Sequence, residues 1–137
     1  MKTLAFPRKA RLKSKIAIDR LFGQAKYKGT ATDKGSCLCY PLRAAWIEPI
    51  KREENDTGIK VLISVPKKRI RKAVERVVTR RRIREAWRVQ RIGLGELNLD
   101  MAIIYIADRP EPFEKIFAAV SKIICILHKH YDNEAHS

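Results

Sequence analysis

The chain has 137 residues, a length that fits one folded domain, and 45% of them are hydrophobic, which is enough for a buried core. Its 30 lysines and arginines outnumber 15 aspartates and glutamates, so the formal net charge is +15. This excess indicates a polyanionic partner. The sequence has neither an apolar run long enough to span a membrane nor a signal-peptide pattern, which predicts a cytoplasmic protein without membrane contact.

The first half of the chain predicts one helix and two extended regions. Ser14 can cap a helix. The apolar stripe of this helix would be Ile18, Leu21, Phe22 and Ala25. Residues 37–47 are expected to be extended, with Pro41 favouring an edge strand or a bend. Residues 59–65 alternate as a strand does. The core side of that strand would be Ile59, Val61, Ile63 and Val65.

The second half predicts helix, strand and helix. Residues 67–91 contain neither Gly nor Pro and are rich in helix-forming residues, so we expect one long basic helix. Residues 101–107 are continuously apolar, as in a strand covered on both faces. A last helix should follow the prolines near residue 110. Its apolar stripe would be Phe113, Ile116, Phe117, Val120, Ile123, Ile124, Leu127 and Tyr131. The strand–helix–strand unit predicts an α/β sandwich.

Three cysteines are present, an odd number without the paired spacing of zinc sites. They are Cys37, Cys39 and Cys125. We expect all three to be reduced, partly buried small hydrophobes in a cytoplasmic protein. A metal-binding or disulfide role is the alternative.

Positive charge is concentrated in two segments of the sequence. Residues 67–91 hold twelve basic side chains and two acidic ones, and residues 1–28 hold nine basic side chains and one acidic one. A solvated helix usually mixes charges of both signs. Arginine outnumbers lysine nine to three in residues 67–91, and its planar guanidinium can donate two parallel hydrogen bonds to phosphate. We therefore predict nucleic-acid binding, with an anionic membrane or an acidic protein as alternatives.

The position of the basic helix favours RNA over DNA. A helix-turn-helix protein places its recognition helix beside another helix, whereas this one lies between two predicted strands. The aromatic signature of an RRM domain is also missing.

From residue 63 to residue 88 the sequence reads ISVPKKRIRKAVERVVTRRRIREAWR. This stretch resembles the signature of the bacterial ribonuclease P protein component, in which a strand and a Lys-Lys pair precede a helix that carries an Arg-Asn-Arg motif. The N-terminal Leu4–Arg8 segment and the apolar last helix also occur in the family's order. The family's central motif appears here as Arg76-Val77-Val78. We expect Val77 and Val78 to pack toward the sheet and Arg82 to compensate as a phosphate contact.

The resemblance implies an α+β fold formed by a single domain over residues 1–137. The element order would be α-β-β-α-β-α, with flexible ends at about 1–10 and 132–137. The sheet would be small and mixed, with a left-handed β-α-β crossover, although right-handed connections are the rule.

The resemblance also implies a function. The chain would be the RNA-binding subunit of ribonuclease P, whose catalytic RNA removes the 5′ leader of precursor tRNA by metal-dependent hydrolysis. Its partners would be the catalytic RNA and precursor tRNA, with no obligate protein partner and with Mg²⁺ bound mainly by the RNA.

The protein would supply neither catalytic residues nor metal ligands. Its carboxylates are scattered, and His128, His130 and His136 lie near the C-terminus, where solvated or helix-end roles are expected. A ribosome-associated RNA-binding protein without an enzymatic role is the alternative.

Two sets of site residues follow from the resemblance. The predicted contacts with RNA are Lys67, Lys68, Arg71, Arg76, Arg80, Arg81, Arg84 and Arg88. A cleft between the sheet and the first helix would hold the single-stranded leader, with Phe22, Trp46 and Arg80 in it. Aromatic rings can stack on unpaired bases without demanding a sequence. A core position is the alternative for Phe22, a strand-edge position is the alternative for Trp46, and Tyr27 or Tyr40 are further candidates for stacking.

Overall fold

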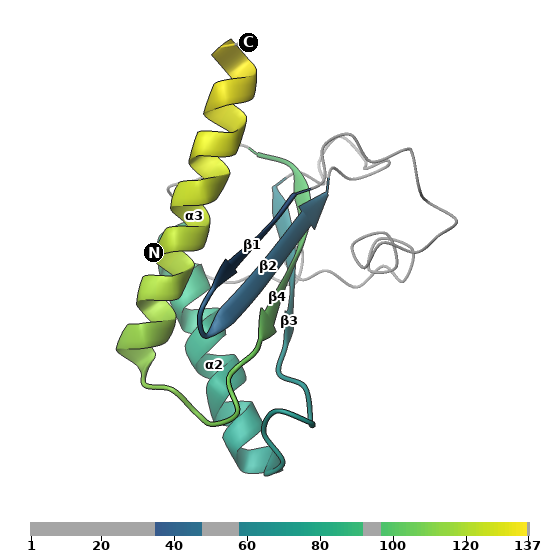
Figure 1. Ribbon diagram of the computed structural model, residues 1–137, viewed down its shortest axis with the longest axis vertical. Helices are drawn as coiled ribbons and strands as arrows, with labels where there is room; N and C mark the ends of the chain where they lie inside the picture. The colour runs from purple at the N-terminus through teal and green to yellow at the C-terminus, as the bar shows by residue number, and fades with distance from the viewer. Residues whose placement is uncertain (1–34, 48–57, 92–96, 137) are drawn as a thin grey trace, which may run out of the picture.

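The computed structural model describes residues 35–47, 58–91 and 97–136, with the side chains of residues 130–136 excepted. The helix expected from Ser14 lies outside these residues. The described elements, in chain order, are β1 (Gly35–Cys39), β2 (Leu42–Ile47), β3 (Ile59–Ser64), α2 (Ala73–Gln90), β4 (Leu99–Tyr105) and α3 (Phe113–His136) (Figure 1). The α+β class is confirmed. The expected order had one extended element over residues 37–47, whereas the structure has two strands there, so the described order is β-β-β-α-β-α.

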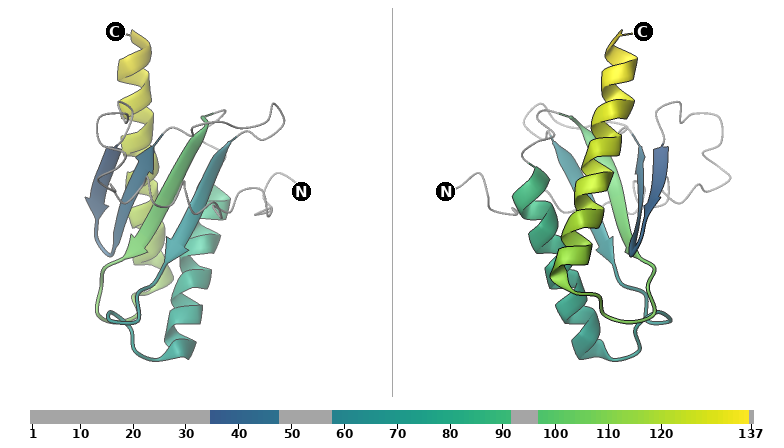
Figure 2. Two further views of the ribbon diagram at one scale, coloured as in Figure 1. Left: turned by 90° about the vertical axis from the view of Figure 1, so that its right-hand side faces the viewer. Right: turned by 60° about the vertical axis from the view of Figure 1, so that its left-hand side comes forward.

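The four strands form one mixed sheet in the order β1-β2-β4-β3. Strands β1 and β2 form an antiparallel hairpin that turns at Tyr40 and Pro41, so the bend expected at Pro41 is confirmed. Strand β4 pairs antiparallel with β2 and parallel with β3. Both helices cover the same face of the sheet (Figure 2).

The connection from β3 through α2 to β4 is left-handed, as the family resemblance implied. In the left view of Figure 2 both helices lie behind the sheet, β3 and β4 point downward, and β4 lies to the left of β3. A right-handed crossover seen from this side would place β4 on the other flank of β3. Because β3 ends at the lower end of the sheet, α2 starts there and runs back along the sheet, with its N-terminus next to the loop that leads into α3.

The core lies between the sheet and the two helices. Its centre includes Trp46, Met101 and Ile103 on the sheet and Trp87 on α2, each no more than 2% exposed. The apolar stripe predicted for the last helix is confirmed where side chains are described, with Ile116, Val120, Ile123, Ile124 and Leu127 buried. Helix α3 continues to His136, through the residues for which a flexible end was expected.

Strand β4 is buried on both faces, which confirms the expectation from its continuous apolar run. Leu99, Met101 and Ile103 belong to the core between sheet and helices. Asp100 and Ala102 point to the opposite face and are also buried, at 4% and 0% exposure. A strand of this kind lacks polar alternation because neither of its faces meets water.

The cysteine prediction is confirmed at two positions and wrong at the third. Cys37 is half-buried, and Cys39 is buried. Burial, together with the adjacent Cys39 thiol, raises the pKa of Cys37 to about 12, so this thiol stays protonated at neutral pH. Cys125 is exposed, because it lies on the outer face of α3. The apolar residues around it in sequence belong to the buried stripe instead.

The backbone of Gly35 is covered by the indole of its cross-strand partner Trp46. A Cβ at this position would lie 2.6 Å from Nε1 of Trp46, which is closer than atoms can pack. We predict that Gly35→Ala lowers the free energy of unfolding by about 1–3 kcal/mol, since the buried ring must shift. Urea unfolding measures this change. Ser36→Ala, at the exposed next position, is the control and should stay within about 0.5 kcal/mol of the parent. Equal stability of the two variants would contradict the prediction.

Candidate nucleic-acid interface

The basic segment begins as a loop, so the prediction of one helix over residues 67–91 is wrong at its start. Helix α2 begins at Ala73. Before it, the amides of Arg69 and Ile70 both donate to the carbonyl of Pro66, at 3.0 and 3.2 Å. Ile70 is only 3% exposed and anchors this loop in the core. A turn with a buried apolar anchor has replaced the first two helical turns that residue propensity favoured.

Arg76 holds this loop against the helix. One of its guanidinium nitrogens donates to the carbonyls of Ile70, at 3.0 Å, and Arg71, at 2.7 Å. Arg76 was predicted to contact RNA; in the structure its guanidinium holds the loop that carries the neighbouring basic residues. The predicted contacts Lys67 and Lys68, like Arg71, are exposed on the loop and do not lie on the helix.

Helix α2 has one buried stripe and one basic side. The stripe consists of Thr79, Ile83, Ala86 and Trp87, at the i, i+4, i+7, i+8 spacing of a helix face. Thr79 satisfies its buried hydroxyl by donating to the carbonyl of Glu75 at 2.8 Å. The indole nitrogen of Trp87 is buried and finds no acceptor among the described residues. At about 100° per residue, four of the predicted contacts lie together on the side of the helix that extends from next to Trp87 to the side opposite the stripe. These are Arg80, Arg81, Arg84 and Arg88, which we call the arginine face.

The residues of the arginine face differ in their partners. Arg88 donates from Nε to Oε2 of Glu85 at 3.0 Å, and its Nη2 contacts the other carboxylate oxygen. The hydrogen bond from Arg88 holds the pKa of Glu85 below its usual range. Within the described residues, Arg80 and Arg81 form no ion pair. These two guanidinium groups are therefore available to an external anion without breaking an existing pair.

The expected packing of the valine pair is wrong. Val77 is 38% exposed and does not pack toward the sheet, and Val78 is partly exposed. The buried stripe passes through Thr79 and Ile83, on another side of the helix. Arg82 does not lie on the arginine face. Its guanidinium donates at 2.8 Å to the backbone carbonyl of Glu111 in the loop between β4 and α3.

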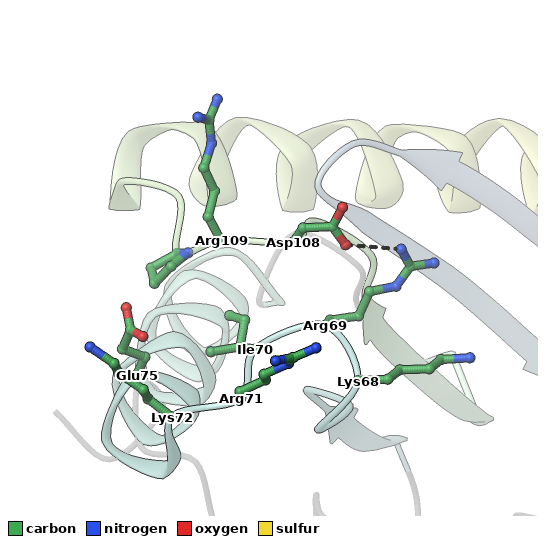
Figure 3. A pocket seen from close by; sticks show the side chains of 9 residues that line it. Lys68, Arg69, Ile70, Arg71, Lys72, Glu75, Asp108 and Arg109 are labelled. Atoms are coloured by element: carbon green, nitrogen blue, oxygen red, sulfur yellow. Dashed lines mark hydrogen bonds and ion pairs between the residues drawn. The ribbon is translucent and has the colours of Figure 1, made fainter.

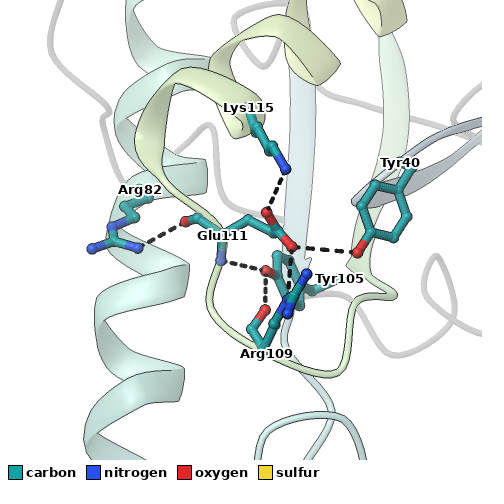
Figure 4. Close-up of polar contacts among 6 residues, drawn as sticks. All are labelled: Tyr40, Arg82, Tyr105, Arg109, Glu111 and Lys115. Carbon is teal, nitrogen blue, oxygen red and sulfur yellow. Dashed lines mark hydrogen bonds and ion pairs between the residues drawn. The ribbon is translucent and has the colours of Figure 1, made fainter.

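Glu111 is the centre of a polar cluster that the sequence did not reveal (Figure 4). Its backbone amide donates to the hydroxyl of Tyr105 at 2.9 Å, and that hydroxyl donates to the carbonyl of Arg109 at 2.6 Å. Burial raises the pKa of Tyr105 to about 12, so the hydroxyl remains a donor. Together with the bond from Arg82, these contacts fix the loop to the end of β4 and to α2.

The carboxylate of Glu111 is buried and receives three further partners. Lys115 forms an ion pair with it at 3.2 Å, and Arg109 forms another at 3.5 Å. Tyr40, in the turn between β1 and β2, donates its hydroxyl at 3.4 Å. The hydrogen bond from Lys115 holds the pKa of Glu111 below its usual range, against the opposing effect of burial. One carboxylate therefore links the hairpin turn, the loop and the start of α3.

The residues predicted to line the leader cleft differ in their exposure. Trp46 is 2% exposed within the core under the helices, so the prediction that its ring stacks on RNA bases is wrong. The alternation of strand β2 turns this side chain toward the helices. Phe22 lies outside the described residues. Tyr40 is 60% exposed and stays a candidate for stacking, and Arg80 is half-buried on α2.

Neither a metal centre nor a membrane span is found in the described part of the chain. Across residues 35–47, 58–91 and 97–136, no three His, Cys, Asp or Glu side chains gather as metal ligands. Within the same ranges, neither helix is both long and apolar enough to cross a bilayer. His128 is exposed on α3, as expected of a solvated histidine.

Comparison with protein families gives a match over most of the chain. A family model described as Ribonuclease P matches residues 6–128. A search of curated proteins finds no match. The matched stretch includes all of α2 and the loop before it, together with every described strand.

The bond from Arg82 to Glu111 yields a stability prediction. Arg82→Ala leaves a partly buried carbonyl without its charged donor, which should lower the free energy of unfolding by about 1–3 kcal/mol. Arg81→Ala, one residue away and exposed, should change it by less than about 0.5 kcal/mol. Urea unfolding of both variants measures the difference. An Arg82→Ala protein as stable as Arg81→Ala would show that the bond contributes nothing.

The depressed pKa of Glu111 predicts a pH dependence of stability. The folded-state pKa lies below the unfolded value of about 4.3, so the ionised carboxylate stabilises the fold above that pH. This contribution is lost as the pH falls from about 4.3 through the folded-state pKa. Glu111→Gln should therefore be less stable than the parent at pH 7 and should lose less stability on acidification. Unfolding curves from pH 7 to pH 3 test this, and parallel profiles for the two proteins would contradict it.

Proposed function

Because the chain belongs to the ribonuclease P family, we propose that it binds the catalytic RNA of ribonuclease P through the arginine face of α2 and the basic loop before it. Family membership supports a role in tRNA processing as the protein subunit of that enzyme, rather than as a ribosome-associated protein. The single observation that carries the proposal is the segregation of α2 into a buried stripe and an arginine face.

The spacing of the arginine face suits a phosphate backbone. Arg80, Arg84 and Arg88 follow one another every four residues, about 6 Å along the axis, and Arg81 widens the row. Guanidinium groups can each donate two parallel hydrogen bonds to a phosphate. Such contacts position the protein without reading bases, so recognition would depend on the shape of a folded RNA.

Rigidity of the helix supports the same proposal. Ile83 and Trp87 fix the rotation of α2 against the core, Arg82 ties it to the loop before α3, and Gln90 donates to the carbonyl of Phe117 at 3.0 Å. Because the backbone that carries the arginines is already ordered, binding would not carry the additional cost of ordering that backbone.

We propose in addition that the protein binds the leader of precursor tRNA, as the resemblance implies. Stacking on an exposed ring and contact with the sugar–phosphate chain would tolerate any leader sequence. Tyr40 and Arg80 are the described residues that suit this role, and Phe22 stays a prediction. Hydrolysis would belong to the RNA subunit and to the Mg²⁺ ions that it binds. The protein would act by reducing phosphate repulsion between the two RNAs, in the cytoplasm and without an obligate protein partner.

Reconstitution tests the proposal. The purified protein is added to a bacterial ribonuclease P RNA and precursor tRNA at low magnesium, and we expect faster 5′ cleavage. In the Arg80→Ala, Arg84→Ala double variant, the slope of log affinity for the RNA against log salt should become shallower by about two, one for each lost phosphate contact. Lys122→Ala, which removes an exposed cation from α3, should leave slope and cleavage unchanged.

Two results would overturn the proposal. Absence of stimulation by the parent protein would argue against a subunit of this enzyme. Cleavage by the protein without RNA would place the chemistry in the protein instead.

A further inference from the structure

Helix α2 carries a row of exposed side chains that binding of RNA by the arginine face does not explain. Exposed positions recur every four residues along the whole helix, and apart from Val74 every exposed residue of α2 belongs to this row. Side chains four residues apart form a continuous ridge on a helix surface. We call this row the outer ridge, and its members are Ala73, Val77, Arg81, Glu85 and Val89.

The outer ridge is largely apolar and has no net charge, in contrast with the rest of this basic helix. Val77 and Val89 are 38% and 40% exposed, and Val74, next to the ridge, is 75% exposed. Arg81 and Glu85 are the charged members, and their charges cancel. A phosphate backbone attracts cations, whereas apolar side chains that lie together on a surface are typical of a contact with another protein.

The order of the ridge residues is self-complementary. From the N-terminal side it reads apolar, positive, negative, apolar, at Val77, Arg81, Glu85 and Val89. Arg81 and Glu85 lie two residues on either side of position 83, and the two valines lie six residues on either side of it. Two copies of α2 that cross antiparallel at this level would place Arg81 of each copy beside Glu85 of the other. Each Val77 would then lie beside Val89 of the other copy, as a two-fold axis requires.

The geometry of such a contact is a common one. Ridges of residues four apart pack into each other's grooves with the helix axes crossing at about 50° and about 8–10 Å apart. The stretch from Val77 to Val89 covers about three turns, which is enough for this contact. The carboxylate of Glu85 already accepts from Arg88 of the same helix. Because two carboxylate oxygens offer about four acceptor sites, Glu85 can also bind Arg81 of a second copy.

We propose that the RNA-free protein self-associates through the outer ridge as a weak, two-fold symmetric dimer. One helix pair buries less than the roughly 800 Å² per partner of a stable complex. Both copies also carry a net charge of +15, although salt screens this repulsion beyond about 8 Å at physiological ionic strength. The dimer therefore forms at high protein concentration, where the paired charges and valines of the ridge outweigh the remaining repulsion.

Reciprocal charge swaps test the proposal by sedimentation equilibrium of the full chain, without RNA and at physiological ionic strength. The average mass of the parent should rise with concentration from the monomer toward the dimer. Arg81→Glu and Glu85→Arg each create two like-charge contacts across the two-fold axis, and each should raise the dissociation constant at least about tenfold. An equal mixture of the two variants should regain association, because each supplies the charges that the other lacks. The double variant Arg81→Glu, Glu85→Arg should regain it as well.

Lys122→Glu on α3 is the matched control. It replaces an exposed lysine and changes the net charge from +15 to +13, as Arg81→Glu does. If net charge alone governed association, both variants would associate more strongly than the parent, and we expect this of Lys122→Glu alone. A parent that keeps the monomer mass at every concentration would overturn the proposal. So would a single swap that associates like the parent, or a mixture that associates no more strongly than its components.

The dimer and the proposed RNA complex should exclude each other, because Arg81 belongs to both the outer ridge and the arginine face. This expectation rests on the proposed function, whereas the dimer itself does not. Adding ribonuclease P RNA to the parent protein should remove the dimer, and a dimer that persists at saturating RNA would contradict the exclusion. Failure of the parent to stimulate cleavage would concern the proposed function alone, since the charge swaps are measured without RNA.

Discussion

A stripe of four buried residues on α2 determines the direction of the arginines on that helix. Thr79, Ile83, Ala86 and Trp87 pack into the core, and Trp87 and Ile83 are completely buried there. Burying two side chains of this size contributes several kcal/mol, since each is worth about 1.5–3 kcal/mol. Turning the helix by one residue would bury an arginine and expose the indole. The arginine face is therefore a consequence of core packing, and its orientation is as stable as the core.

Polar contacts around Glu111 join the loop before α3 to the neighbouring elements. The buried carboxylate of Glu111 joins Tyr40 at the hairpin turn to Lys115 at the start of α3, and its own carbonyl accepts the bond from Arg82 of α2. A buried carboxylate is costly unless it is paired and hydrogen-bonded, and here both conditions are met. The loop before α3 is consequently held next to the start of α2, where residues of both loops, among them Arg71 and Arg109, line a shallow hollow (Figure 3).

The sequence predicted the parts of the fold whose hydrophobic pattern has a single explanation. The continuous run in β4 and the stripe of α3 each correspond to one kind of burial. In residues 59–65, Val61 and Val65 of the predicted core side are buried, and Ile59 and Ile63 are partly buried against the core. The start of α2 could not be predicted in this way, because helix propensity is local and the buried contact of Ile70 is not. Trp46 was misplaced for a related reason: most of β2 is buried, so its sequence does not tell which face meets the helices.

Within the candidate site, the sequence predicted where the positive charge lies, but it did not predict the hydrogen-bond partners of the individual arginines. Residue types alone located the basic segment that became the arginine face. Residue types did not distinguish Arg81, whose side chain is exposed, from Arg82, whose guanidinium donates a hydrogen bond to the carbonyl of Glu111. The two residues are adjacent, and only the rotation of the helix about its axis distinguishes them. That rotation depends on residues of β4 and α3 that lie far away in the sequence.

The same concentration of positive charge places a constraint on the free protein. Like charges on neighbouring turns repel, and Lys72 opposes the dipole of the helix that it starts. Both terms destabilise α2. Burial of apolar side chains offsets them, and Trp87, which is completely buried, is the largest buried side chain of this helix.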